Sequence, residues 1–121
     1  MKYLKTYENL KPVISYYRNG QKRREEHFLN GFCHREDGPS NQYWYDNGQK
    51  STESYYINDE RHREDGPAIQ EWHRNGQKKY ETYYLNDRRY SREYWLNKLK
   101  EIGSPHYQEQ LFKYEADQYN L

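Results

Sequence analysis

The sequence predicts an all-β protein: an elongated, single-layer antiparallel meander of about seven strands, built from 28-residue hairpin repeats and ending in a short C-terminal capping helix. Three observations predict this class. Short motifs return at a fixed interval, each copy contains residues typical of tight turns, and the segments between the turns are rich in Tyr and Trp. Aromatic side chains favour strands and can be buried against a sheet.

The repeat is visible in two motifs. NGQK begins at Asn19, Asn47 and Asn75, which are 28 residues apart (47 − 19 and 75 − 47), and HREDGP spans 34–39 and 62–67 with the same phase. A fixed period without insertions indicates one structural unit stacked on copies of itself. We expect a single domain over 1–121, with units at about 12–39, 40–67 and 68–95 and a cap over 96–121. The residues expected to hold the repeat together are Asn19, Gly20, Asn47, Gly48, Asn75, Gly76, His34, Asp37, Gly38, Pro39, His62, Asp65, Gly66 and Pro67.

Each unit contains three turn signals. Asn-Gly between aromatic-rich stretches predicts a type I′ hairpin turn, which would place Trp44 opposite Ser51 and Gln42 opposite Glu53. In that register Trp44 and Lys50 lie on opposite faces of the sheet. Asn-Asp or Asn-Gly, eleven residues after each Asn-Gly motif, is the second turn, and Asp-Gly-Pro is the third.

The last stretch leaves this pattern. Ser104 and Pro105 resemble the first two residues of a helix, and Tyr107, Leu111 and Tyr114 recur at i, i+4 and i+7. We therefore expect a helix over about 104–117 that covers the final strand.

Composition limits the function. The 121 residues include 20 basic and 19 acidic side chains, and a net charge of +1 argues against a nucleic-acid partner. Aliphatic residues are scarce, but 16 Tyr and 3 Trp argue against disorder. The sequence shows no apolar run for a membrane span or a secretory leader, and a single cysteine, Cys33, leaves no internal disulfide. We expect an intracellular, non-secreted protein.

The segments YYRNGQK, WYDNGQK and WHRNGQK, together with HREDGPA between hairpins, resemble MORN-type repeats (membrane occupation and recognition nexus). The resemblance covers about 12–95 and is to the longer variant common in proteins of giant DNA viruses and their satellites. It implies a single-layer antiparallel sheet, a role in scaffolding, dimerisation or lipid contact, and a location in host cytoplasm or virion. The third unit departs from it, because the HREDGP motif is lost there.

The titratable motifs suggest no catalytic, cofactor or metal site. Equivalent positions of His34 and His62 would lie about 9.6 Å apart in a meander, too far to share one zinc ion. Glu25, Glu53 and Glu81 form a row of carboxylates that we interpret as structural. Each is expected to pair with a basic residue that recurs in the repeat, such as Lys50 or Arg63. Cys33 aligns with arginines in the other units, so the repeat does not require it. The sequence therefore predicts that the chain is not an enzyme.

The aromatic side chains are the candidate binding surface, because Tyr, Trp and Arg carry much of the energy of interfaces. A single-layer sheet cannot bury both faces by itself, so one face or an open edge should meet another molecule. We expect a protein-interaction or scaffold module that self-associates, as a homodimer, with further protein partners unidentified. The alternative is a peripheral surface for lipid headgroups or nucleic acid. The candidate surface residues are Tyr43, Trp44, Tyr45, Trp72, Tyr80 and Trp95.

Overall fold

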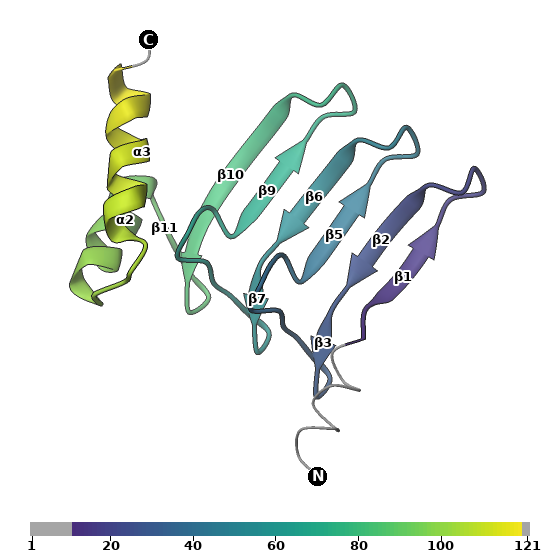
Figure 1. The fold of residues 1–121 in the computed structure, drawn as a ribbon, viewed down its shortest axis with the longest axis horizontal. Helices are drawn as coiled ribbons and strands as arrows, with labels where there is room; N and C mark the ends of the chain where they lie inside the picture. The colour runs from purple at the N-terminus through teal and green to yellow at the C-terminus, as the bar shows by residue number, and fades with distance from the viewer. Residues whose placement is uncertain (1–10, 120–121) are drawn as a thin grey trace.

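The computed structural model describes residues 11–119 and contains one open, seven-stranded antiparallel sheet (Figure 1). The predicted meander of about seven strands is confirmed. The expected domain of 1–121 also includes 1–10 and 120–121, which lie outside the described residues. In spatial order the strands are β1 (Val13–Tyr16), β2 (Lys22–Glu26), β5 (Asn41–Trp44), β6 (Lys50–Ser54), β9 (Ile69–Trp72), β10 (Lys78–Leu85) and β11 (Arg88–Tyr90).

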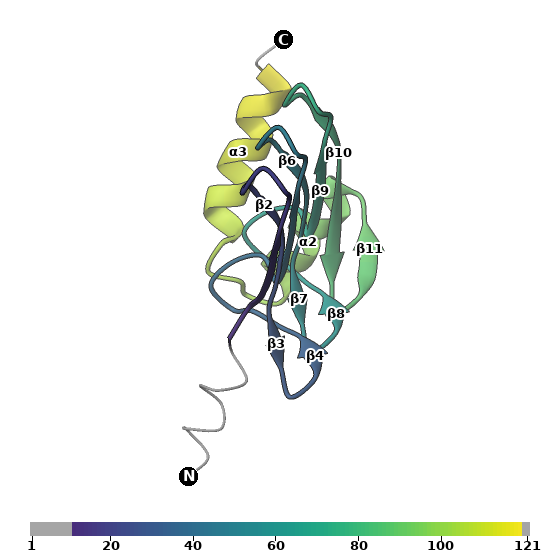
Figure 2. The ribbon, with the colours of Figure 1, turned by 90° about the vertical axis from the view of Figure 1, so that its right-hand side faces the viewer.

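Each of the first two units also forms a short second hairpin below the main sheet. These hairpins are β3 (Phe28–Leu29) with β4 (Phe32–Cys33), and β7 (Tyr56–Ile57) with β8 (Glu60–Arg61). Viewed edge-on, the main sheet is one layer thick, and the short hairpins continue its lower end (Figure 2). In the third unit the two hairpins merge, because β10 runs on to pair with β11.

The turn of the long hairpin differs from the predicted type I′. Gly48 has a φ of +89°, but Asn47 before it does not have a positive φ. Tyr45 N–H donates to Gln49 O (2.8 Å), and Gly48 N–H donates to Tyr45 O (3.1 Å). The loop is therefore three residues long, a type I turn followed by a left-handed glycine, the other common solution for Asn-Gly.

The longer loop and a bulge change the register near the turn. Gln42 lies opposite Glu53, as predicted, but Trp44 lies opposite Lys50 instead of Ser51, with an irregularity between Tyr43 and Trp44. Lys50 therefore lies on the same face as the tryptophans, which corrects the expected distribution of side chains. A bulge inserts one residue into one strand and reverses which face the following side chains occupy.

The type I′ geometry occurs instead in the second hairpins. Asn58 (φ +48°) and Asp59 (φ +66°) form a two-residue loop between Ile57 and Glu60, which are directly paired. The loops 30–31 and 86–87 have the same positive φ at both residues. Asn and Asp tolerate this conformation better than other non-glycine residues, which explains why they stand at these positions.

Polar side chains join each unit to the next. Asn19 Nδ2 donates to Asp46 O (2.8 Å) and Asn47 Nδ2 donates to Arg74 O (2.9 Å), so the first residue of NGQK binds the following turn. The hydroxyls of Tyr17 and Tyr45 donate in the same way to backbone carbonyls of the next unit, each at 2.7 Å. The repeat period is thus enforced by hydrogen bonds as well as by the strand ladder.

The C-terminal cap consists of two helices, α2 (Arg92–Glu101) and α3 (Tyr107–Tyr119). The predicted helix is confirmed as α3, although it ends later than expected, and Ser104 Oγ accepts from His106 N–H just before it. Helix α2 was not predicted. It begins inside the third unit, so the cap starts near residue 92 instead of 96, because Ser91 replaces the lost HREDGP motif with a helix N-cap.

The hydrophobic core lies between this cap and the last strands. Leu85, Leu96 and Leu99 are buried there around Trp95, which is 0% exposed. Trp95 packs its ring on Tyr83, with centroids 4.7 Å apart, and its Nε1 donates to Arg63 O (3.0 Å). The sheet itself has few buried apolar side chains, so this cluster is the main apolar contribution to folding.

We predict that Trp95→Ala lowers the free energy of unfolding by about 3–5 kcal/mol, because it leaves a cavity in the only buried apolar cluster found within residues 11–119. Urea unfolding followed by circular dichroism measures this. Tyr94→Ala is the matched control, since the neighbouring ring is exposed and its removal should change stability by less than about 0.5 kcal/mol. Equal losses for the two variants would contradict the assignment of the core.

Candidate interaction surface

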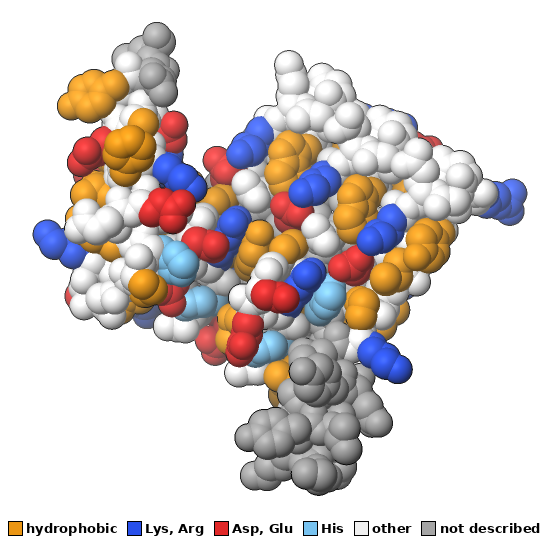
Figure 3. Space-filling model, in the orientation of Figure 1, with side chains coloured by type: hydrophobic (Ala, Val, Ile, Leu, Met, Phe, Trp, Pro, Cys, Tyr) orange, Lys and Arg blue, Asp and Glu red, His pale blue; other side chains and the backbone are white. Residues whose placement is uncertain are grey.

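One face of the sheet carries alternating basic and aromatic side chains, and we call it the tryptophan face. Lys22 Nζ lies 5.2 Å from the centroid of the Trp44 ring, and Lys50 Nζ lies 5.9 Å from that of Trp72. Each lysine therefore covers the ring of the following unit, a favourable cation–π arrangement. The alternation crosses the sheet in Figure 3. The row consists of Tyr16, Lys22, Trp44, Lys50, Trp72 and Lys78.

The carboxylate row lies beside these rings. Lys50 Nζ is 3.0 Å from Glu53, and the equivalent lysines contact Glu25 at 2.8 Å and Glu81 at 3.0 Å. Hydrogen bonds from Lys22 and His27 hold the pKa of the Glu25 carboxyl below its usual value, against the opposing effect of burial. The predicted pairing with Lys50 is confirmed. Arg63, the other suggested base, binds Asp65 instead.

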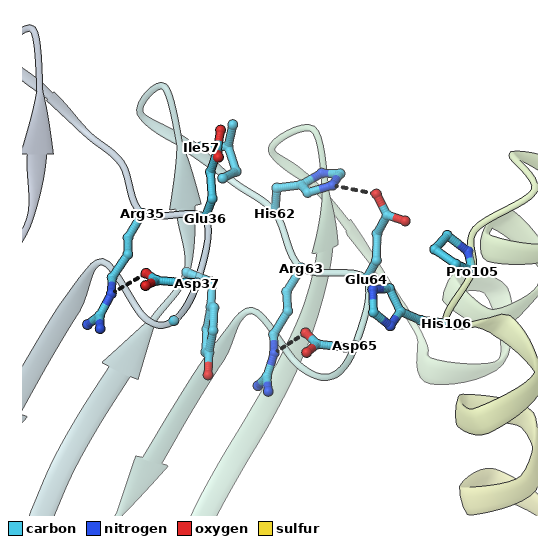
Figure 4. Close-up of a pocket in the computed structure, with 12 residues that line it drawn as sticks. Arg35, Glu36, Asp37, Ile57, His62, Arg63, Glu64, Asp65, Pro105 and His106 are labelled. Atoms are coloured by element: carbon cyan, nitrogen blue, oxygen red, sulfur yellow. Dashed lines mark hydrogen bonds and ion pairs between the residues drawn. The ribbon is translucent and has the colours of Figure 1, made fainter. Parts of the chain in front are cut away.

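The two HREDGP motifs form equivalent loops over the lower part of this face (Figure 4). Arg63 Nε donates to Asp65 Oδ1 (2.9 Å), its Nη1 donates to Pro67 O (3.0 Å), and its guanidinium lies 3.9 Å from the Tyr55 ring centroid. Arg35 makes the same two hydrogen bonds within its own loop. The arginine therefore closes the loop and fixes it to the sheet.

The histidines of these motifs hold the next hairpin. The Nδ1 atoms of His34 and His62 accept the backbone N–H groups of Asn58 and Asn86, each at 3.0 Å. Each histidine thus binds a type I′ turn of the following hairpin. Within residues 11–119 no group of three or more His, Cys, Asp and Glu side chains is placed to hold a metal ion.

A hollow lies between the two loops and the link from α2 to α3 (Figure 4). Its wall includes Glu64, whose carboxyl is 3.2 Å from His62 Nε2. Burial raises the pKa of Glu64, but hydrogen bonds from Ser104 and His62 outweigh it, so the net shift is downward. The Glu64 carboxyl thereby joins its loop to Ser104 of the cap.

Cys33 lies in the short β4 strand, away from this hollow. Burial and the neighbouring Asp59 carboxylate both raise the pKa of its thiol. The Asp59 side chain also accepts the Cys33 backbone N–H at 2.6 Å. A raised thiol pKa disfavours the nucleophilic thiolate.

The opposite face carries unrepeated tyrosines, and we call it the tyrosine face. Arg24 lies opposite Tyr43, Tyr43 opposite Thr52, Thr52 opposite Glu71, and Glu71 opposite Tyr80. The Tyr43 hydroxyl donates to Glu26 (3.2 Å), and Tyr80 is 43% exposed, with its hydroxyl bound to Glu71. The hydrogen bond to Glu71 raises the pKa of Tyr80.

The six predicted surface residues do not form one patch. Trp44 and Trp72 lie on the tryptophan face, and Tyr43 and Tyr80 on the tyrosine face. The Tyr45 ring lies under Arg74 near the turns. Trp95 is a correction: it is fully buried in the cap core and cannot take part in a surface, because the unpredicted helix α2 carries it inward.

Sequence reasoning expected an open edge but did not name the apolar residues that form it. Val13 is 50% exposed, Ile14 36% and Tyr16 60%, all in β1, the first strand of the sheet. Within residues 11–119, β1 pairs only with β2.

Comparison with known protein families, with curated proteins and with solved structures finds no match. Among the residues that the structure describes, no helix is long and apolar enough to cross a membrane.

We predict that Glu25→Gln flattens the acid end of the stability profile. The folded pKa of Glu25 is lowered from 4.5, so its contribution is present above that value and is lost as the pH falls below it. Unfolding free energies measured from neutral pH to about pH 3 should therefore fall less in the variant than in the wild type. The control is Glu60→Gln on an exposed strand, which should keep the wild-type slope.

Proposed function

We propose that the chain is a non-catalytic β-repeat module for protein–protein interaction or scaffolding, and that it self-associates. The observation that carries this proposal is a single-layer sheet with both faces open and with partly exposed rings on each. A sheet normally buries at least one face against another layer. Here the two helices lie at one end of the sheet, beside β10 and β11 (Figure 1).

The internal pairing of charges supports a binding role for the rings. The repeated glutamates and the loop aspartates each have a basic partner within the chain. These charged groups are already paired and need no partner from another molecule. Partly exposed Tyr and Trp side chains, by contrast, contribute binding free energy when an interface buries them.

The tyrosine face is the surface that we assign to a protein partner. Tyr43 occupies the position held by Ser15 and Glu71 in the other units, and Tyr80 the position held by Arg24 and Thr52. The repeat therefore does not need a ring at either position. A side chain that the fold does not require is a better candidate for binding than one repeated in every unit.

We further propose that the array belongs to the MORN-type repeats, on the strength of the NGQK and HREDGP motifs. A viral origin, in host cytoplasm or virion, follows from the same resemblance. The intracellular placement is supported by the single cysteine.

Binding to lipid headgroups or nucleic acid is the alternative. The first hairpin contributes Arg18, Lys22, Arg23 and Arg24, but Lys22 and Arg24 are paired with Glu25 and Glu26. The remaining basic surface is small. Binding of this kind weakens steeply with salt, which gives a way to recognise it.

We predict that the double variant Tyr43→Ala with Tyr80→Ala reduces recovery of a protein partner about tenfold, as expected when interface rings are removed. The tagged chain is used to capture partners from its native extract at low and high salt, and the bound proteins are quantified by mass spectrometry. Tyr119→Ala, at a very exposed position of α3, is the control and should bind as wild type. Recovery of lipid or nucleic acid that is lost at high salt would contradict the proposal in favour of the alternative.

A further inference from the structure

Over the described residues, strand β1 forms one edge of the sheet. Within residues 11–119 it pairs only with β2, and its other side faces outward at the first end of the array (Figure 1). Three of its four residues are exposed apolar side chains, namely Val13, Ile14 and Tyr16. An open edge with apolar side chains is a template for pairing with another strand.

The internal junctions show what such an edge accepts. The strands β5 and β9 occupy the same position in their units as β1, and each pairs with the last long strand of the preceding unit. In each of these strands a lysine of the preceding unit makes a cation–π contact with the tryptophan ring, and a tyrosine hydroxyl donates a hydrogen bond to the tryptophan backbone carbonyl. The equivalent ring in β1 is Tyr16, for which the described residues supply neither partner.

The internal junctions show which backbone N–H and C=O groups of β1 point away from β2. At the internal junctions Ser40 O accepts from His27 N–H, and Ala68 O accepts from Tyr55 N–H, so this position of the unit directs its backbone away from its own hairpin. Backbone groups alternate along a strand. The equivalent position in the first unit is Pro12, and the outward residues of β1 are therefore Ile14 and Tyr16.

We propose that a second copy of this chain binds here, with the two β1 strands antiparallel across a two-fold axis. This inference rests on the self-association in the proposed function and specifies its site. In the register that pairs the outward-pointing backbone groups of both strands, Ile14 lies opposite the partner's Tyr16 and forms two backbone hydrogen bonds with it. The two-fold axis generates a second, identical pair between Tyr16 and the partner's Ile14. Side chains on the axis come from Ser15 of both copies. The result is one continuous sheet of two arrays.

The outward backbone groups and Pro12 favour this register. It forms hydrogen-bonded pairs with the two outward residues of β1, Ile14 and Tyr16. Residues that face each other between two hydrogen-bonded pairs approach to about 4.5 Å between Cα atoms, so the two Ser15 residues lie close together at the axis. The same pairing places each Ile14 beside a tyrosine ring and keeps Pro12, which lacks an N–H, outside the hydrogen-bonded pairs.

A head-to-tail arrangement is disfavoured by the other end of the array. There β11 pairs with Tyr83–Leu85 of β10, and helices α2 and α3 occupy the region that a following unit would need (Figure 1). Head-to-tail contacts also continue indefinitely, whereas a two-fold contact closes as a dimer.

Charge near the edge gives the proposal a salt dependence. Lys11 and Arg18 flank β1, and the antiparallel pairing brings the Lys11 end of one strand to the Arg18 end of the other. These like charges repel, and salt screens them. Self-association through β1 should therefore strengthen with salt, opposite to binding of nucleic acid or anionic lipid.

The test is disulfide trapping of the full chain with Cys33→Ser as the background. Ser15→Cys should form an intermolecular disulfide under oxidised glutathione, because Cα atoms about 4.5 Å apart lie within the range of disulfides. Val13→Cys is the matched control on the same edge. In this register its Cα lies about 13 Å along the strand from the partner's residue 13, so it should cross-link at least tenfold more slowly. Equal rates, or no dimer with Ser15→Cys, would overturn the register.

A second variant separates the edge from the fold and from the proposed function. Ile14→Pro removes an outward N–H that β2 does not use, so circular dichroism should remain as in wild type while sedimentation shows at least a tenfold loss of dimer. Capture through Tyr43 and Tyr80 should be unchanged in this variant. A wild-type chain that stays monomeric at every concentration and salt would refute the dimer alone, whereas loss of capture only in the tyrosine variants would still support the interaction module.

Discussion

The structure depends on one constraint: a sheet without a second layer must obtain its cohesion along its own length. The side-chain amides of Asn19 and Asn47 meet this constraint, because each binds the turn of the following unit. The tyrosine hydroxyls bind backbone carbonyls of the next unit at the end of its first strand, and the histidine Nδ1 atoms bind the backbone of its second hairpin. Polar contacts between neighbours thus replace much of the burial that holds a layered domain together, as expected of repeat arrays.

This arrangement explains an unusual composition. Each unit contacts mainly its neighbours, so it needs side chains that offer a large contact surface and also carry a group able to form hydrogen bonds. Tyr, Trp, Arg and His have both properties. Arg63 shows the combination, because its guanidinium stacks on Tyr55 while its N–H groups close the loop. Scarce aliphatic residues are concentrated where a true core exists, around Trp95 and Leu99.

The repeat made the architecture predictable, while local geometry limited the detail. The 28-residue period and the turn residues were enough for the meander and for the pairing of Gln42 with Glu53. The face of Lys50 was not predictable, because Asn-Gly is compatible with two loops that differ by one residue, and one residue exchanges the faces. Helix α2 was missed for another reason: it crosses the boundary that the sequence placed between the third unit, 68–95, and the cap, 96–121. The interaction surface was least predictable. Trp95 was expected on the surface because it lies outside the repeated aromatic positions, but helix α2 buries it in the core beside the last strands.

The two ends of the array differ in a way that bears on assembly. Unit repetition alone would leave two complementary ends and therefore favour polymers. In this chain the last unit is altered: its loop motif is lost, Ser91 starts a helix, and the cap supplies the apolar core. Over the described residues 11–119 the sheet begins with β1, which corresponds to the strands at the internal junctions. The proposed dimer joins two such edges. The cap at one end and the β1 edge at the other thus fit the proposed closed dimer better than an open filament, and edge pairing of this kind would leave both faces of the sheet uncovered.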